Sequence, residues 1–224
     1  MTANYSHAAN MAYRVLIALK ISELPIDPLE ILNKCTNTVT HKYSEVMQRF
    51  GKTNRVAFKL DCMEGHDAIT IRHDFGNKVG YEVLYDDGAN PFRRRFTLAH
   101  ELGHIILNHS MEEKYEEDEA DYFAAELLAP SPVLQMLWEQ NIPKQIDTIS
   151  IVFSLSRSAS YLQLGGHHHQ YNQERYCAIQ NQFLPCVRKL VEERDWLLGE
   201  LACRNARTVP EMYINGEIPG LHVS

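Results

Sequence analysis

Residues 90–107 read NPFRRRFTLAHELGHIIL, and this stretch decides the fold. Asn90 followed by Pro91 is typical of a helix start, with Asn as the N-cap and Pro at the first helical position. Apolar residues recur at helical spacing and form one face, which consists of Phe96, Ala99, Leu102, Ile105 and Ile106. We therefore expect an amphipathic helix that packs this face on a core.

Two histidines in this helix are four residues apart. His100 and His104 then lie on one face, one turn above the other. Both rings can reach one cation at the roughly 2.0–2.1 Å that zinc prefers. Glu101 is rotated by about 100° from His100, so it flanks the metal and can act as the base toward a water molecule. The pattern predicts a Zn²⁺ site with His100 and His104 as ligands and Glu101 as the catalytic residue.

Gly103, inside the same helix, costs about 1 kcal/mol relative to alanine. A close approach of another segment explains a glycine there better than helix stability does. His109 lies five residues past His104 and, on a continued helix, is rotated about 140° away from the ligand face. We interpret it as a structural residue.

A third ligand is expected, because catalytic zinc sites usually have three protein ligands and a water. A second predicted helix runs from about Glu116 to Leu128 and buries the stripe Ala120, Phe123, Ala124, Leu127 and Leu128. Glu116 and Glu117 lie within about 50° of the centre of that stripe, so either can be the third ligand. Asp121 follows Glu117 by one turn and is expected to orient a ligand histidine from the second shell of the site. The other acids, Asp118, Glu119 and Glu126, are interpreted as a solvated face.

Residue patterns in the rest of the sequence predict further helices and a small sheet. A first helix buries Met11, Ala12, Val15, Leu16 and Leu19, and a short one covers 29–34. Strand signals fall at 55–60, 68–71 and 80–85. Two short helical pieces over 146–164 resemble a helix-turn-helix, and 187–198 is expected to be helical.

The predicted fold class is α+β. We expect a mainly helical metalloprotease core with a small antiparallel sheet, followed by a helical, helix-turn-helix-like region. The corresponding domains are residues 1–130 for the zinc metallopeptidase, 131–165 for the helical region, and 166–224 for a C-terminal extension without an assigned role.

Composition narrows the classes of partner. The 224-residue chain has a formal net charge of −7, which disfavours broad binding to nucleic acid or anionic membranes. Residues 131–165 carry two acids and two bases, so direct nucleic-acid binding is not expected there. The chain has no run of about 18 apolar residues, so no membrane span is expected. Five cysteines at irregular spacing favour the cytoplasm. His167, His168 and His169 match no metal pattern with the cysteines and are interpreted as loop residues.

Two segments resemble the ImmA/IrrE family of metallopeptidases. They are FTLAHELGH, residues 96–104, and EDEADYFAAELLAP, residues 117–130. The resemblance implies a gluzincin-like site with His100, His104 and the first acid of the Glu117-x-x-Ala120-Asp121 pattern as ligands. It thus selects Glu117 over Glu116. It also implies that the substrate is a helix-turn-helix repressor, although residues 166–224 match nothing in the family.

The resulting hypothesis is a zinc-dependent endopeptidase that cleaves a helix-turn-helix transcriptional repressor of a mobile element or stress regulon. The alternative is a zinc-holding regulatory or DNA-binding protein that cleaves nothing. Glu101 favours cleavage, because a scaffold does not need that base. Tyr85, Tyr122 and His109 are candidates for a second oxyanion donor. The sequence carries no signal for an oligomeric state.

Overall fold

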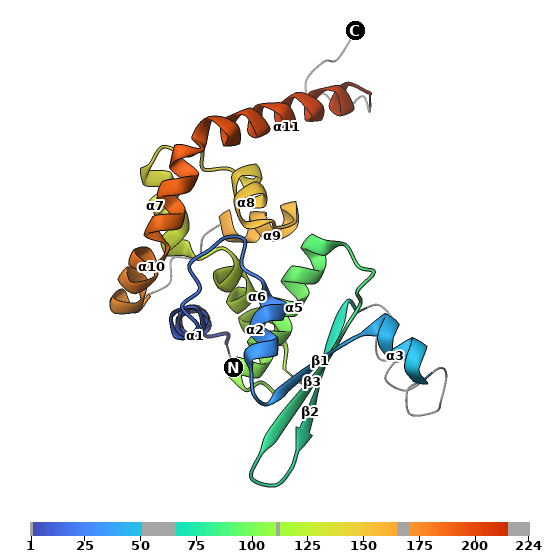
Figure 1. Cartoon of the computed structure of the whole chain (residues 1–224). Coiled ribbons are helices and arrows are strands. Elements are labelled where there is room, and N and C mark those ends of the chain that lie inside the picture. The colour runs from blue at the N-terminus through green and yellow to red at the C-terminus, as the bar shows by residue number, and fades with distance from the viewer. Residues whose placement is uncertain (1, 51–65, 111–112, 165–170, 215–224) are drawn as a thin grey trace.

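The computed structural model describes residues 2–50, 66–110, 113–164 and 171–214 of the chain, with side chains up to residue 204. Its centre is a pair of packed helices, α5 (Pro91–Leu107) and α6 (Lys114–Leu128). Helix α1 (Tyr5–Ala18) packs on α6, while the sheet contacts α5 (Figure 1). This arrangement confirms the α+β class and the mainly helical core.

Helix α5 begins and ends at residues that explain its bounds. The Asn90 side chain accepts hydrogen bonds from the backbone N–H groups of Phe92 and Arg93, at 3.0 and 3.4 Å, as the Asn-Pro pair predicts. At the other end Asn108 adopts the left-handed conformation with φ of 56°. Such a C-terminal residue stops a helix and redirects the chain. Residues after Asn108 therefore do not continue the helical rotation.

Gly103 lies where α5 and α6 approach each other closely. A Cβ atom at this position would lie 3.1 Å from Cδ1 of Phe123 and 3.2 Å from both Cα and O of Ala120. Any larger residue would therefore push against the backbone of α6. The close approach expected from the sequence is confirmed.

The sheet has the strand order β1-β3-β2, with β1 at Thr38–Lys42, β2 at Ala68–Asp74 and β3 at Val79–Tyr85. Strands β2 and β3 form the expected antiparallel hairpin, in which Ala68 pairs with Tyr85 and Asp74 with Val79. Gly76, with φ of 73°, supplies the turn conformation that most residues avoid.

Strand β1 makes the sheet mixed instead of antiparallel throughout, because it pairs in parallel with β3. It is five residues long and reads TVTHK, too short and polar to give a strand signal. The connection through α3 (Tyr43–Phe50) and the following residues permits the parallel pairing, since such pairs need a long crossover. The strand expected at 55–60 lies outside the described residues.

The two N-terminal helices form where the sequence predicts them, but in the first one only Ala12 and Leu16 of the predicted stripe are fully buried, while Met11, Val15 and Leu19 are partly buried. In α1 the fully buried residues are Ala8, Ala9, Ala12, Tyr13 and Leu16. Helix α2 (Pro28–Lys34) starts at Asp27, whose carboxylate accepts the N–H of Leu29 at 3.0 Å. Both helices thus position their apolar sides on the core around α5 and α6.

The C-terminal half is helical. It comprises α7 (Ser131–Glu139), α8 (Ile146–Phe153), α9 (Arg157–Leu164), α10 (Gln173–Glu192) and α11 (Arg194–Ile214). The pair α8–α9, joined through Ser154 at φ of 51°, is the two-helix unit expected at 146–164. The helix expected over 187–198 is instead interrupted at Glu193, where α10 ends.

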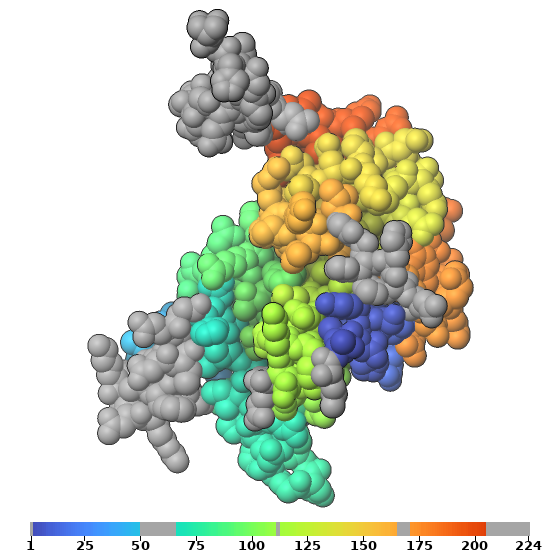
Figure 2. Space-filling view, turned by 180° about the vertical axis from the view of Figure 1, so that it is seen from behind, coloured from blue at the N-terminus to red at the C-terminus, as the bar shows by residue number. Residues whose placement is uncertain are grey.

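The β2–β3 hairpin and the α7–α8 segment lie at opposite ends of the molecule (Figure 2). Helix α11 extends away from the body beyond α8 (Figure 1). In the described residues no helix combines the length and the apolar character that a membrane span requires. The α5–α6 pair, which carries the candidate site, lies between the two ends.

Candidate metal centre

Three side chains of α5 and α6 converge on one point. The Nε2 atoms of His100 and His104 are 2.9 Å apart. The Glu117 carboxylate reaches both, with its oxygens 3.3 Å from His100 Nε2 and 3.4 Å from His104 Nε2. One ligand atom from each residue lies within 4.8 Å of the other two. The structure therefore brings together the residues expected as ligands, two from one helix and one from the next.

The geometry of this triad fits a tetrahedral cation. With bonds of about 2.0–2.1 Å, tetrahedral zinc places its ligand atoms about 3.3 Å apart. The two contacts of Glu117 match that separation, and the histidine pair is somewhat closer. Two nitrogen lone pairs at 2.9 Å repel each other unless a proton or cation lies between them. The donor set, two imidazoles and a carboxylate, suits a divalent transition metal.

His100 is oriented from behind by Asp121, as the sequence predicts. Its Nδ1 lies 2.8 Å from Oδ1 of Asp121, so an Nδ1–H donated to the carboxylate leaves Nε2 free for a metal. Burial lowers the pKa of His100, but the hydrogen bond to Asp121 and the negative charges of Glu101 and Glu117 outweigh burial. The pKa of His100 is consequently raised above its usual value.

His104 is held by a different partner, His109. The Nδ1 atoms of the two rings are 3.0 Å apart, and Nε2 of His109 lies 3.1 Å from Oε2 of Glu119. All three residues are buried. Burial, followed by the nearby His100 and His109, lowers the pKa of His104 to about 3. The ring is thus neutral near pH 7, the form that binds metals.

Glu101 lies beside the triad and outside it. Its side chain is buried, and Oε2 accepts a hydrogen bond of 2.5 Å from the Thr70 hydroxyl of β2. Burial raises the pKa of Glu101, although the bond from Thr70 and the charge of His100 act in the opposite direction. A carboxylate with a raised pKa next to a metal is suited to accept and return a proton. The Thr70 contact had no sequence signal, because it depends on how β2 packs on α5.

Glu116 is not part of the triad, although helical geometry alone allowed it. It is buried at the start of α6, where its carboxylate accepts hydrogen bonds from the backbone N–H groups of Ser110 and Glu113, at 3.0 and 3.4 Å. It therefore stabilises the N-terminus of α6.

Two of the acids that the sequence assigned to a solvated face are buried, and that interpretation is wrong for them. Glu119 and Glu126 are 8% and 1% exposed, whereas Asp118 is exposed as expected. The reason is that α6 packs against α5 on one side and α1 on the other, so its buried arc is wider than its apolar stripe. Both acids find hydrogen-bond donors there, as buried charges must.

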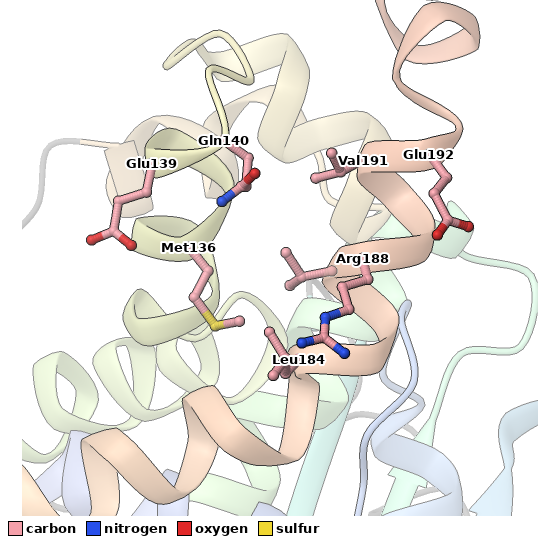
Figure 3. Close-up of a pocket in the computed structure, with 8 residues that line it drawn as sticks. Met136, Glu139, Gln140, Leu184, Arg188, Val191 and Glu192 are labelled. Carbon is pink, nitrogen blue, oxygen red and sulfur yellow. The ribbon is translucent and has the colours of Figure 1, made fainter.

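The three candidates for a second oxyanion donor have different surroundings. His109 lies on the Nδ1 side of His104, away from the ligand atom Nε2. The Tyr122 hydroxyl is 3.3 Å from that of Tyr171, and Tyr85 is a buried residue of β3. A pocket of about 450 Å³ between α7 and α10, near Met136 and Arg188, is a separate feature (Figure 3). His167, His168 and His169 lie outside the described residues.

The α8–α9 pair shows little chemistry for binding phosphates. Arg157 of α9 forms an ion pair with Asp147 of α8. The other base expected in this region is Lys144, in the loop before α8. A recognition helix normally directs several basic side chains at the nucleic-acid backbone. The pairing of Arg157 is more consistent with a packing role for this helix pair.

A search of curated proteins gave no match. The family model Peptidase_M78, described as the IrrE N-terminal-like domain, matches residues 60–164. That range contains β2, β3, the α5–α6 pair and the α8–α9 pair. This match confirms the resemblance to the ImmA/IrrE family over residues 60–164.

Proposed function

We propose that the protein is a zinc-dependent endopeptidase with His100, His104 and Glu117 as metal ligands and Glu101 as the catalytic base. The observation that carries the proposal is the convergence of three ligand atoms within 4.8 Å, with a buried carboxylate beside them. The match of residues 60–164 to a peptidase family model supports the reaction type. A zinc ion held there supplies a Lewis acid that lowers the pKa of a water molecule and polarises a peptide carbonyl.

The chain itself contributes proton transfer and orientation. Glu101 accepts a proton from the attacking water through the oxygen atoms beside the triad, and then delivers it to the leaving amine. Thr70 holds Oε2 of Glu101, which fixes the carboxylate relative to α5. Asp121 and His109 hold the ring nitrogens that face away from the metal, so that both Nε2 atoms point at one position.

We further propose that the substrate is a helix-turn-helix repressor in the cytoplasm, cleaved at one or a few positions. The family resemblance supports this class of substrate. Helix α9 contacts α6, and it exposes Tyr161 and Leu162, by 66% and 53%. Exposed apolar residues on a helix beside the site suit docking of a protein partner. The target must offer an extended, locally unfolded segment, because a folded domain cannot enter a site between two helices.

Glu101→Gln separates the base from the ligands. The variant is expected to retain zinc and folding while losing peptide cleavage by roughly 10²–10⁴-fold, the usual contribution of a general base. Zinc content by elemental analysis and cleavage by mass spectrometry give the two readouts. Loss of zinc in Glu101→Gln, or cleavage at the wild-type rate, contradicts the assignment.

The substrate class is tested by incubating the zinc-loaded protein with casein and, separately, with the helix-turn-helix repressor whose gene lies nearest to the gene of this protein. Selective cleavage of the repressor supports the proposal. Rapid digestion of casein with an intact repressor contradicts it. Tight binding of the repressor without cleavage by the zinc-loaded protein identifies a sequestering protein instead.

A further inference from the structure

A buried chain of three side chains leads away from the candidate metal position. It runs from His104 through His109 to Glu119, with separations of 3.0 and 3.1 Å. We propose that His109 and Glu119 are positioning residues that hold the His104 ring in the tautomer and orientation that present Nε2 to the metal. The inference rests on the proposed metal site and adds two residues to it.

The direction of these two hydrogen bonds follows from Glu119, the last of the three side chains. An ionised carboxylate only accepts hydrogen bonds. Glu119 Oε2 therefore accepts from Nε2–H of His109, which leaves Nδ1 of a neutral His109 as an acceptor. That acceptor requires Nδ1–H on His104, so the lone pair of His104 is on Nε2. The Glu119 carboxylate, which is connected to His104 by two hydrogen bonds through His109, thus selects the metal-binding form of this ligand.

The carboxylate is itself fixed from the opposite side. Oε1 of Glu119 accepts the backbone N–H of Asn4, the N-cap residue of α1, at 2.6 Å. Both oxygens are then engaged, and Glu119 is 8% exposed, His109 5% and His104 3%. Little water competes for these bonds, and a buried network of this kind is strongly directional. By contrast, the Asp121 side chain that orients His100 is 51% exposed.

The turn after α5 explains how His109 reaches His104. Because Asn108 is left-handed, the chain folds back and the backbone N–H of His109 donates to the carbonyl of His104 at 3.0 Å. The imidazole of His109 then stacks edge-on to that of His104, with ring centroids 5.0 Å apart. Rotation along a continued helix had placed His109 on the far side. The structure assigns it to the ligand instead.

A pair of substitutions at His109 tests the contact with His104 separately from the contact with Glu119. In His109→Asn the side-chain oxygen replaces Nδ1 and still accepts from His104. In His109→Gln the amide nitrogen replaces Nε2 and still donates to Glu119, but the acceptor for His104 is lost. We expect His109→Gln to weaken zinc binding by about 10–100-fold and His109→Asn by less than about fivefold, following the usual effect of partners behind a ligand.

Glu119→Gln tests whether the Glu119 carboxylate sets the direction of the hydrogen bonds through His109. The amide can accept from only one of the two N–H groups that the carboxylate satisfies, those of Asn4 and His109. We expect a loss of zinc affinity of about 10–100-fold. The matched control is Glu126→Gln, which changes another buried carboxylate of the same helix. In the described part of the chain its hydrogen-bond donors include no histidine, and we expect the variant to keep wild-type zinc affinity.

The readouts are zinc affinity by chelator competition and the ¹⁵N–¹H spectrum of the histidine rings in the metal-free protein. The wild-type spectrum is expected to show His104 protonated at Nδ1, and Glu119→Gln a mixture of tautomers. Equal zinc affinities for His109→Asn and His109→Gln, or an unchanged tautomer in Glu119→Gln, overturn the inference. Neither readout requires peptide cleavage. If the wild-type protein binds no zinc, the proposed metal site fails. If it binds zinc and His109→Gln and Glu119→Gln bind it with wild-type affinity, only this inference fails.

Discussion

Two groups of carboxylates in α6 act in opposite ways. Glu117 and Asp121 have side chains exposed by 56% and 51%, and each directs its oxygens at the histidines of α5. Glu126, near the end of the helix, is 1% exposed and accepts hydrogen bonds from Tyr13, Ser131 and Gln163, which belong to α1, α7 and α9. One helix thus carries an open cluster, Glu117 and Asp121, and a closed cluster around Glu126.

The difference separates function from stability. At Glu126 every oxygen is satisfied by donors of the protein, and the donors come from three helices, so this cluster holds the helices together. At the open cluster the Nε2 atoms of His100 and His104 and the oxygens of Glu117 converge on one point. Acceptor atoms that face one another in this way are suited to a cation. Substitutions in the open cluster are therefore expected to change zinc affinity, and substitutions in the closed cluster to change the free energy of unfolding.

Glu117→Ala sharpens the comparison most. Removal of a ligand is expected to lower zinc affinity by more than the roughly 100-fold that changes behind a ligand produce. Asp118→Ala, at the exposed neighbouring position, is the control and should bind zinc as the wild type does. Chelator competition measures both. Similar losses in the two variants contradict the assignment of Glu117.

Glu126→Ala probes the closed cluster. The change leaves the hydroxyls of Tyr13 and Ser131 and the backbone N–H of Ser131 without the carboxylate that accepts from them. We expect the free energy of unfolding to fall by about 1–3 kcal/mol, the cost of unsatisfied buried groups, as measured by urea denaturation. The zinc affinity of the folded variant should stay unchanged. A fall of more than about tenfold in zinc affinity contradicts the separation of Glu126 from the carboxylates that face the histidines.

The pH dependence of zinc binding distinguishes the two ligand histidines. His100 has a raised pKa, so a proton competes with zinc there as the pH falls through that value, whereas His104, at about 3, stays neutral above pH 5. Apparent affinity should fall about tenfold per pH unit on the acidic side, the slope for one proton. In Asp121→Asn, which removes the charge that raises the pKa of His100, the fall should begin at lower pH. Zinc affinity measured between pH 5 and 7.5 tests this prediction. A fall of about a hundredfold per pH unit, the slope for two protons, contradicts it.

Gly103→Ala has the smallest expected effect. The added Cβ crowds Phe123 and the backbone of Ala120, at a typical cost of about 1–3 kcal/mol, against a gain of about 1 kcal/mol in helix propensity. A net loss of about 1 kcal/mol is expected in thermal or urea unfolding. Gly199→Ala in α11, where nothing lies within 4 Å of the added atom, should stabilise the protein by up to about 1 kcal/mol. Stabilisation by both substitutions rules out the close contact between α5 and α6.

The sequence by itself determined the features that depend on spacing within one helix. Four-residue spacing placed His100 and His104 on one face of α5, and Asn90-Pro91 set where that helix begins. The family resemblance added the choice of Glu117 over Glu116. The assignment of a repressor substrate and the division at residues 130 and 165 stay predictions.

Only the tertiary structure decided the features that depend on contacts between elements. The left-handed Asn108 turns His109 back onto His104, and an asparagine after the last apolar residue was the one signal for such a turn. Burial of Glu119 and Glu126 arises because α1, over a hundred residues away in sequence, covers α6 and supplies the N–H of Asn4 and the hydroxyl of Tyr13. A helical wheel ranks residues by the apolar stripe of their own helix. Whether an acid is buried depends on which donors other helices bring to it.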